Sequence, residues 1–176
     1  MPPNPGRVVL RRARPSDRAE FIELMRRSRG HLRPWIYAPE TPDAFDELIR
    51  RGRTDEYDFL LMCLREGGVV AASFNFSQIF RGGFQSAYLG FAAGESYAGR
   101  GLMTEGLGLA LRHAFRTLRL HRVEANVQPA NERSKALVKR CGFRLEGYSP
   151  RYLKVGGRWR DHERYAVTVE DWKAAG

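Results

Sequence analysis

The stretch that decides the fold is SYAGRGLMTEGLGLALRHAF, residues 96–115. The tripeptide Gly99-Arg100-Gly101 stands directly before a segment whose apolar residues recur at helical spacing: Leu107, Ala110, Leu111, Ala114, Phe115 and Leu118. The first turn of such a helix offers free backbone amides and the positive end of the helix dipole, which together can hold a phosphate. The same residues also fit a plain turn. They are no Walker loop, since no GK[ST] follows, and no GxGxxG fingerprint.

Outward from this stretch, the chain alternates strand-like and helix-like segments. Strands are expected at 8–12, 57–64, 69–79, 86–92, 122–127, 148–155 and 158–169, and helices after Pro15-Ser16-Asp17, behind the cap Thr41-Pro42, from Leu102 and over 131–141. This order predicts a mixed α/β layer in which helices cover both faces of one sheet. The sequence shows neither a repeat nor a linker, so we expect one domain over residues 1–176, with residues 1–6 as a loose tail.

The bulk composition is that of a folded protein, with an unusual net charge of +10 on 176 residues. The apolar runs are shorter than a membrane span, and the N-terminal MPPNPGRVVL lacks the apolar region of a secretory signal, so a cytoplasmic location is expected. Cys63 and Cys141 belong to no metal-binding cluster and are expected to be reduced. The charge favours polyanionic partners such as a phosphate-rich cofactor, RNA or the ribosome, although arginine-rich proteins can carry it without one.

A second motif, VQPANERSKALVKRCGF, covers residues 127–143. Ser134, Leu137, Val138 and Cys141 share one helical face, and Asn131 lies one turn earlier on the same face. Polar side chains on an otherwise apolar face need partners, because burying them unpaired costs about 1–3 kcal/mol. Asn131 could cap the helix while Ser134 bonds back to the backbone, or both could face a ligand beside the Gly99 loop. The residues leave both interpretations open.

Together these motifs resemble the GNAT family of acetyl-CoA-dependent N-acetyltransferases. The resemblance rests on the order strand, glycine loop, helix, strand, PxNxxS, helix and GF, and it covers residues 10–172. Within the family, FNFSQIFRGGFQSAYLGF, AGRGLMTEGL, EGYSPRYLKVGGRWRDHERYA and HLRPW are similar to the Rim-type (RimJ-like) ribosomal-protein-alanine acetyltransferases. The resemblance implies a seven-stranded, mixed and mostly antiparallel sheet with helices on both faces, acetyl-CoA as the co-substrate, and no metal.

The resemblance also implies a set of cofactor-binding residues, which are Phe91, Ala92, Ala93, Gly99, Arg100, Gly101, Met103, Thr104, Asn131 and Ser134. Backbone amides of the loop 98–104 would hold the pyrophosphate, and the Ala92 backbone would polarise the thioester carbonyl. Ser134 would protonate the departing thiolate. Ala98 and Met103 depart from the residues usual in the family, but backbone amides donate whatever the side chain.

The general base is the least defined part of the implied site. Where a relative has a glutamate after EGY, this chain has Ser149-Pro150-Arg151, which leaves Asp161 as the base candidate, with His162 beside it. Either side chain could instead pair with a neighbouring arginine, and a water held by backbone carbonyls would also serve. Glu105, in the first turn of its helix, is expected to be structural. The apolar surroundings of Cys141 disfavour a covalent acetyl-enzyme.

These interpretations give one functional hypothesis and two alternatives. The hypothesis is direct acetyl transfer, in a ternary complex, to the N-terminal alanine of a ribosomal protein, with Trp35 and Tyr152 bordering the acceptor groove. The first alternative keeps the fold and acetylates a small-molecule amine such as a polyamine or an antibiotic, which the basic charge disfavours. The second is a non-catalytic module associated with RNA or the ribosome. The oligomeric state cannot be read from the sequence.

Overall fold

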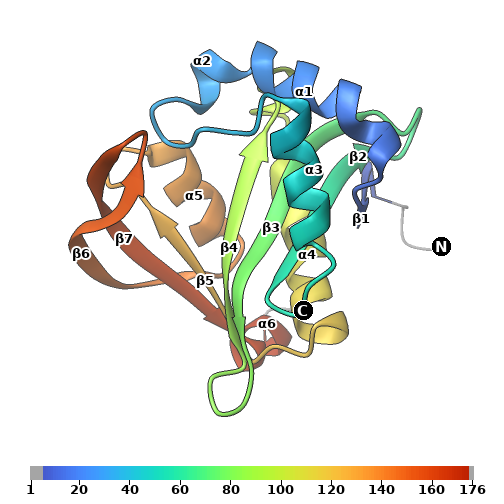
Figure 1. The fold of residues 1–176 in the computed structure, drawn as a ribbon. Helices are drawn as coiled ribbons and strands as arrows, with labels where there is room; N and C mark the ends of the chain where they lie inside the picture. The colour runs from blue at the N-terminus through green and yellow to red at the C-terminus, as the bar shows by residue number, and fades with distance from the viewer. Residues whose placement is uncertain (1–5, 175–176) are drawn as a thin grey trace.

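Figure 1 shows the fold as a computed structural model, which describes residues 6–174. One sheet contains the strands in the order β1-β2-β3-β4-β5-β7-β6. Their bounds are β1 Val8–Arg12, β2 Tyr57–Leu64, β3 Val70–Phe80, β4 Ser86–Ala93, β5 Arg122–Val127, β6 Arg144–Val155 and β7 Arg158–Thr168. Strands β4 and β5 pair in parallel, and the other neighbours pair antiparallel. The predicted seven-stranded, mixed and mostly antiparallel sheet is confirmed.

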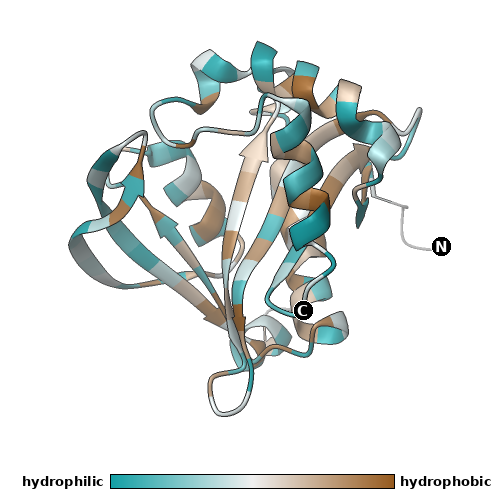
Figure 2. Cartoon of the chain, in the orientation of Figure 1, coloured by the Kyte–Doolittle hydropathy of each residue, from teal (hydrophilic) through white to brown (hydrophobic). Residues whose placement is uncertain are grey.

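Helices pack on both faces of the sheet, as the sequence predicts. Helices α4 (Leu102–Arg112) and α5 (Glu132–Arg140) bury one apolar core against it, and α1 (Arg18–Arg27) and α3 (Pro42–Arg51) bury another on the opposite face. In the second core Phe21 and Phe45 stack at a ring-centroid distance of 5.1 Å. Figure 2 shows hydrophobic colour along the central strands and hydrophilic colour on much of the outer helix surfaces. Burial of these stripes holds the layers together.

Two helix boundaries follow local signals in the sequence. The side chain of Thr41 accepts a hydrogen bond from the amide of Ala44 (3.3 Å), and a proline fills the first turn of α3, as predicted. Helix α4 begins behind Gly101 and continues after Arg112 as a π-turn, in which the amide of Leu118 donates to the carbonyl of His113 (3.0 Å). The amphipathic segment is therefore helical, with a widened last turn.

Within Pro15-Ser16-Asp17, the segment that precedes the first predicted helix, Asp17 links two elements. Its side chain does not cap α1. Instead it receives two hydrogen bonds of 2.7 Å from the Arg11 guanidinium and one of 2.7 Å from the amide of Arg14. Asp17 is the last residue of a short 3₁₀ helix, Pro15–Asp17, which directly precedes α1. The carboxylate thus ties the start of α1 to the end of β1.

Three elements differ from the predicted boundaries. Helices α2 (Arg29–Leu32) and α6 (Val169–Ala174) were not expected, since one or two turns are too short to show a period. Strand β6 begins at Arg144 rather than at residue 148. Its register against β7 shifts between Leu145 and Gly147, and such a bulge interrupts the alternation by which strands are recognised.

The sheet opens between its two central strands. Ser86, Ala87 and Tyr88 of β4 pair with β5, but the pairing ends there although both strands continue. In Figure 1 the two strands lie together near the β3–β4 turn and diverge toward the end of the sheet that lies beneath α1 and α2. The far half of β4 therefore borders a gap on its β5 side.

The described part of the chain begins at Gly6, whose carbonyl accepts a hydrogen bond from Nε of Arg65 (2.5 Å). Residues 1–5 of the predicted tail lie outside the described residues. Every helix that the structure describes is too short or too polar to cross a membrane.

Candidate active site

The loop before α4 has the backbone shape that its glycines predict. Gly99 and Gly101 have φ values of 71° and 75°, in the left-handed region that glycine adopts readily. No side chain caps α4 at Gly101. In the described part of the chain, the amides from Gly99 to Thr104 donate to no other protein group. A run of free amides at a helix N-terminus is an anion-binding arrangement.

This loop opens onto a cavity of about 700 Å³ between α4, α5 and the end of β4. Most of the predicted cofactor-binding residues line it: Phe91, Ala93, Gly99, Gly101, Met103, Thr104, Asn131 and Ser134. Two do not: Ala92 lines a neighbouring cavity, and the exposed side chain of Arg100 lies outside both. The structure thus brings together the two sequence motifs, which are some thirty residues apart, around one space.

Helix α5 presents its N-terminal turn to this cavity. The side chain of Asn131 caps the helix by accepting a hydrogen bond from the amide of Ser134 (3.2 Å). The Ser134 hydroxyl itself has no hydrogen-bond partner among the described residues and lines the cavity. The sequence left open whether these residues cap the helix or face a ligand. In the structure Asn131 caps α5, and Ser134 faces the cavity.

Two arginines of α5 add positive charge to the same wall. Arg133 and Arg140 both line the cavity, two turns apart on one helical face. Arg140 donates to Oγ1 of Thr104 (3.2 Å), next to the free amides of α4. Nη1 of Arg133 lies 3.0 Å from Nδ1 of His31, a residue of α2 that also lines the cavity. The seven-residue spacing of the two arginines indicates that they share a helical face, but the sequence analysis did not identify them as site residues.

The backbone of β4 alternates between its two neighbours. The amide of Gly94 donates to the carbonyl of Ala71 in β3 (2.9 Å), within the register that pairs Ala92 with β3. In an antiparallel pair every second residue bonds to the partner strand, so Ala92 also faces β3, whereas Phe91 and Ala93 face the gap. The Ala92 amide therefore points away from the gap, contrary to the sequence prediction. The amides of Phe91 and Ala93 are the ones turned toward it.

A second cavity of about 370 Å³ lies on the face of the sheet that carries α1 and α3. It shares Trp35, Ile36 and Phe91 with the first cavity, so the two spaces meet at these side chains. Gly90 and Asn75 form part of its floor, and a Cβ on Gly90 would lie 2.6 Å from Oδ1 of Asn75. The predicted groove residue Trp35 therefore borders both spaces.

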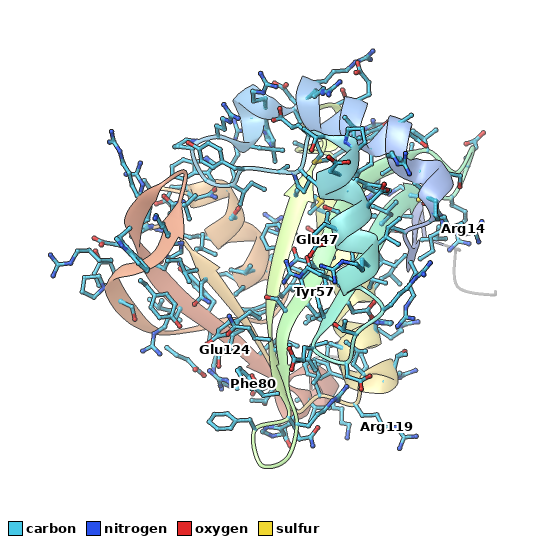
Figure 3. All side chains as sticks on the ribbon, in the orientation of Figure 1. Arg14, Glu47, Tyr57, Phe80, Arg119 and Glu124 are labelled. Carbon is cyan, nitrogen blue, oxygen red and sulfur yellow. The ribbon has the colours of Figure 1, made fainter. Side chains whose placement is uncertain are left out.

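The other predicted groove residue, Tyr152, lies outside the lining of both cavities. Its ring packs against His162 at a centroid distance of 6.2 Å. The Tyr152 hydroxyl, together with partial burial, raises the pKa of Tyr88 to about 12. Tyr88 pairs with Glu124 at the last step before the strands part, and Figure 3 labels Glu124 at that closed end of the sheet. Tyr152 thus belongs to a polar cluster at the base of the gap.

The base candidate Asp161 is engaged within its own hairpin. Its carboxylate accepts hydrogen bonds from the hydroxyl of Tyr148 and from the amide of Arg151 (2.7 Å for the latter). These bonds hold the pKa of Asp161 below its usual value, which weakens it as a base. His162 is buried, and burial lowers its pKa. The geometry therefore favours the arrangement in which both side chains stabilise the hairpin.

Glu105 and Cys141 have the roles that the sequence predicts for them. Glu105 accepts hydrogen bonds from the amide of Val8 (3.1 Å) and from Nε of Arg7 (3.2 Å), and so attaches β1 to α4. Burial raises the pKa of the Cys141 thiol to about 11, which keeps it protonated at neutral pH and a poor nucleophile. Cys63 and Cys141 are both free thiols.

Three features meet at this site: a glycine loop with free amides at a helix N-terminus, a parted pair of strands, and two cavities that share lining residues. Such an arrangement can hold a phosphate-bearing ligand beside a second ligand. The chain belongs to the GNAT acetyltransferase family, since residues 7–144 match its acetyltransferase (GNAT) domain. It is accordingly an N-acetyltransferase, as the sequence predicts.

The chain is also similar to individual members of this family. The chain is 34% identical to the [ribosomal protein uS5]-alanine N-acetyltransferase of Escherichia coli K12, over 94% of this chain and 90% of that protein. Its fold superposes on RimJ of Mycobacterium smegmatis, solved in complex with CoA-disulfide, with a TM-score of 0.85 and 30% identity over 93% and 83% of the two chains. It is also 22% identical to the spermidine N(1)-acetyltransferase of E. coli K12, over 92% of this chain and 87% of that protein.

Proposed function

We propose that this enzyme transfers the acetyl group of acetyl-CoA directly to a protein N-terminus, the N-terminal alanine of a ribosomal protein. The observation that carries the proposal is the meeting of the two cavities at Trp35, Ile36 and Phe91. One cavity opens beside an anion-binding loop, and the other opens on the opposite face of the sheet. Two substrates can therefore occupy the site together, which direct transfer requires.

The first cavity fits coenzyme A by its chemistry. The free amides from Gly99 to Thr104 suit a diphosphate, and Arg133 and Arg140 supply positive charge for further phosphate oxygens. The gap beside β4 leaves the polar backbone of Phe91 and Ala93 unpaired, which suits an arm that carries amide groups. When bound, acetyl-CoA supplies an activated thioester.

The chain's own residues then account for the rest of the reaction. The amides of Phe91 and Ala93 can donate to an oxygen that gains negative charge in the gap. The Ser134 hydroxyl, which has no partner among the described residues, holds a proton that can pass to a departing sulfur. Trp35 lines both cavities, at the place where the two substrates would meet. An α-amine with a pKa of about 8 loses its proton readily near neutral pH, so solvent can serve as the base.

The second cavity, which we call the acceptor cavity, has a lining that disfavours a polyamine. Of the described residues that line it, none is acidic, and Lys154 is cationic. A polycation would meet repulsion there, whereas positive surroundings favour the neutral form of a single α-amine. The weak similarity to a spermidine acetyltransferase is therefore not matched by the chemistry of this cavity.

A panel of acceptors tests the proposal. The protein is incubated with acetyl-CoA and with Ala-starting or Ser-starting peptides, the same peptides with a blocked N-terminus, and spermidine, while free thiol is measured. We expect turnover with the free peptides alone. Turnover with spermidine alone would refute the proposal. An absence of turnover combined with tight RNA binding would favour the non-catalytic alternative.

The wider cellular setting belongs to the same proposal. The net charge of +10 is suited to contact with ribosomal RNA, and N-terminal acetylation of a ribosomal protein takes place in the cytoplasm. Co-sedimentation of the purified protein with ribosomes, at low and at high salt, tests that contact. A contact of this kind must weaken steeply with salt.

A further inference from the structure

The mouth of the acceptor cavity carries several cations. Lys154 lines the cavity from the β6–β7 hairpin, and Arg158 begins the second strand of that hairpin. The ring of Tyr37 lies against the hairpin turn, since a Cβ on Gly156 would be 2.4 Å from it. The guanidinium of Arg33 stands 4.7 Å from the centre of the same ring. Lys154 is therefore the cation that lines this cavity, while Arg158 follows the hairpin turn and Arg33 stands over the lining residue Tyr37.

Nearby carboxylates reach Arg33 but neither of the two hairpin cations. Glu40 is bound by Arg29 and lies 3.9 Å from the Arg33 guanidinium, at the outer limit of an ion pair. Asp161 gives its oxygens to hydrogen bonds within its own hairpin. The two hairpin cations are exposed and form no ion pair with any residue that the structure describes. Lys154 and Arg158 thus have no counter-charge among the described residues, whereas Arg33 shares Glu40 with Arg29.

The acetyl donor does not account for this charge. Its proposed phosphate partners, Arg133 and Arg140, line the other cavity, together with the amides that begin α4. Lys154 and the turn of the β6–β7 hairpin line only the acceptor side. The unpaired cations therefore face whatever continues beyond the acetylated amine.

We propose that the acceptor is a protein N-terminus whose residues directly after the acetylated one are acidic. This inference rests on the proposed function and names the substrate class of the same site. Carboxylates in that segment would pair with Lys154, Arg158 and Arg33 as the chain leaves the cavity. Such rim charges act mainly by steering the encounter, so they should raise kcat/KM most at low salt.

Matched peptides test the inference. Short Ala-starting peptides carry Asp and Glu from the second position onward, or Asn and Gln, or Lys, and kcat/KM is measured for each with acetyl-CoA at low and at physiological salt. We expect the acidic peptide to exceed the neutral one by about tenfold at low salt, with the Lys peptide slowest, and the advantage to shrink as salt rises.

Variants connect that preference to the hairpin. The double substitution Lys154→Gln, Arg158→Gln should reduce the ratio of kcat/KM for the acidic peptide to kcat/KM for the neutral peptide by about fivefold. Lys173→Gln, on the exposed surface of α6, is the control and should change neither rate. Both altered hairpin positions are exposed, and circular dichroism checks that the variants fold.

The outcomes separate this inference from the proposed function. Equal rates for acidic and neutral peptides, or a preference for the Lys peptide, overturn the inference and leave N-terminal acetylation standing. An unchanged preference in the hairpin double variant also overturns it. If no peptide with a free α-amine is acetylated, the proposed function fails, and the inference fails with it.

Discussion

Ser134 and Asn131 belong to the same motif but have different roles in the structure. Asn131 fills the cap position of α5 and satisfies the Ser134 amide, so the Ser134 hydroxyl is left free to face the cofactor cavity. The sequence placed both residues on the right helical face. It could not assign the cap to one and the cavity to the other, because both side chains can cap a helix.

Replacing this hydroxyl should affect the chemical step. We expect Ser134→Ala to lower kcat by about 10- to 100-fold, with little change in the Kd of acetyl-CoA, because a positioned proton donor acts in the transition state. Single-turnover kinetics and calorimetric titration measure the two quantities. Thr117→Ala, at an exposed position beyond α4, is the control. An unchanged kcat would remove Ser134 from the mechanism.

The buried imidazole of His162 should make stability depend on pH. Burial lowers its pKa in the folded state below the ordinary value of 6.5, so the unfolded chain binds more protons as the pH falls through that value. Stability contributed by the neutral ring is present above the unfolded pKa and is lost as the pH falls. We expect the wild-type free energy of unfolding in urea to decline more steeply from pH about 7 to about 5 than that of His162→Gln. Equal slopes would contradict this expectation.

At the scale of elements, α4 and its loop depend on backbone shape. Gly101 has a φ of 75°, and a Cβ there would lie 3.3 Å from Nη2 of Arg7, whereas Gly108 in the middle of α4 has no atom within 4 Å of such a Cβ. The two positions on one helix therefore provide a matched pair. A comparison of alanine substitutions at the two positions separates the effect of the left-handed loop conformation from the effect of helix propensity.

Alanine at these two positions should act in opposite directions. We expect Gly101→Ala to destabilise the protein by about 1–2 kcal/mol and to raise the Kd of acetyl-CoA, since the left-handed conformation is strained for alanine. Gly108→Ala should stabilise α4 by about 0.5–1 kcal/mol at unchanged Kd. Thermal unfolding and calorimetric titration provide both values. A Gly101→Ala protein that binds acetyl-CoA normally would contradict the role given to the loop.

The β6–β7 hairpin offers a second matched pair. Gly156 and Gly157 both have positive φ, but only Gly156 approaches another residue, the ring of Tyr37. We expect Gly157→Ala to lose about 1 kcal/mol of stability and Gly156→Ala to lose more, because its Cβ would also overlap the Tyr37 ring. Gly156→Ala should in addition raise the KM for the acceptor peptide, because it pushes the hairpin off the Tyr37 loop. Equal KM values in the two variants would show that this contact does not shape the groove.

Elements with a regular repeat of apolar residues, or with clear capping residues at their ends, were predictable from the sequence, and the others were not. The stripe through α4 and the cap at Thr41 are local, so they could be read without the fold. Helix α2 is a single turn, and the start of β6 is interrupted by a bulge, so neither leaves a period to detect. The Ala92 error has another origin: which amides of a strand face a gap depends on pairing with β3, which no local pattern records.

At the scale of the whole molecule, the sequence predicted the fold, because its motifs follow each other in a specific order, and most of the predicted cofactor-binding residues line one cavity. The sequence missed the parts of the site that form by juxtaposition. The contact between His31 and Arg133 joins residues 102 positions apart. Tyr152 could not be assigned to the base of the gap rather than the acceptor cavity, since bulges in β6 change which side its residues face.

Occupation of the gap should stabilise the whole molecule. At a concentration of about 100 times Kd, acetyl-CoA should add about 2.7 kcal/mol to the free energy of unfolding if it binds only the folded chain. Thermal unfolding with and without acetyl-CoA measures this increase. Hydrogen exchange should slow at the Phe91 and Ala93 amides in the same samples, because they face the gap. Stabilisation with unchanged exchange at those amides would place the ligand outside the gap.

The parting of β4 and β5 also has a mechanical consequence. Among the described residues, the sheet consists of two parts, β1–β4 and β5–β7, whose strands pair with each other only along Ser86, Ala87 and Tyr88. Such a joint acts as a pivot, and small rotations about it would widen or narrow the far end, where Trp35 and Phe91 stand between the two cavities. A donor seated between the two parts would act as a wedge that fixes their angle. We therefore expect the acceptor cavity to take its working shape only after the donor has bound. The divided sheet would then require the donor to bind before the acceptor.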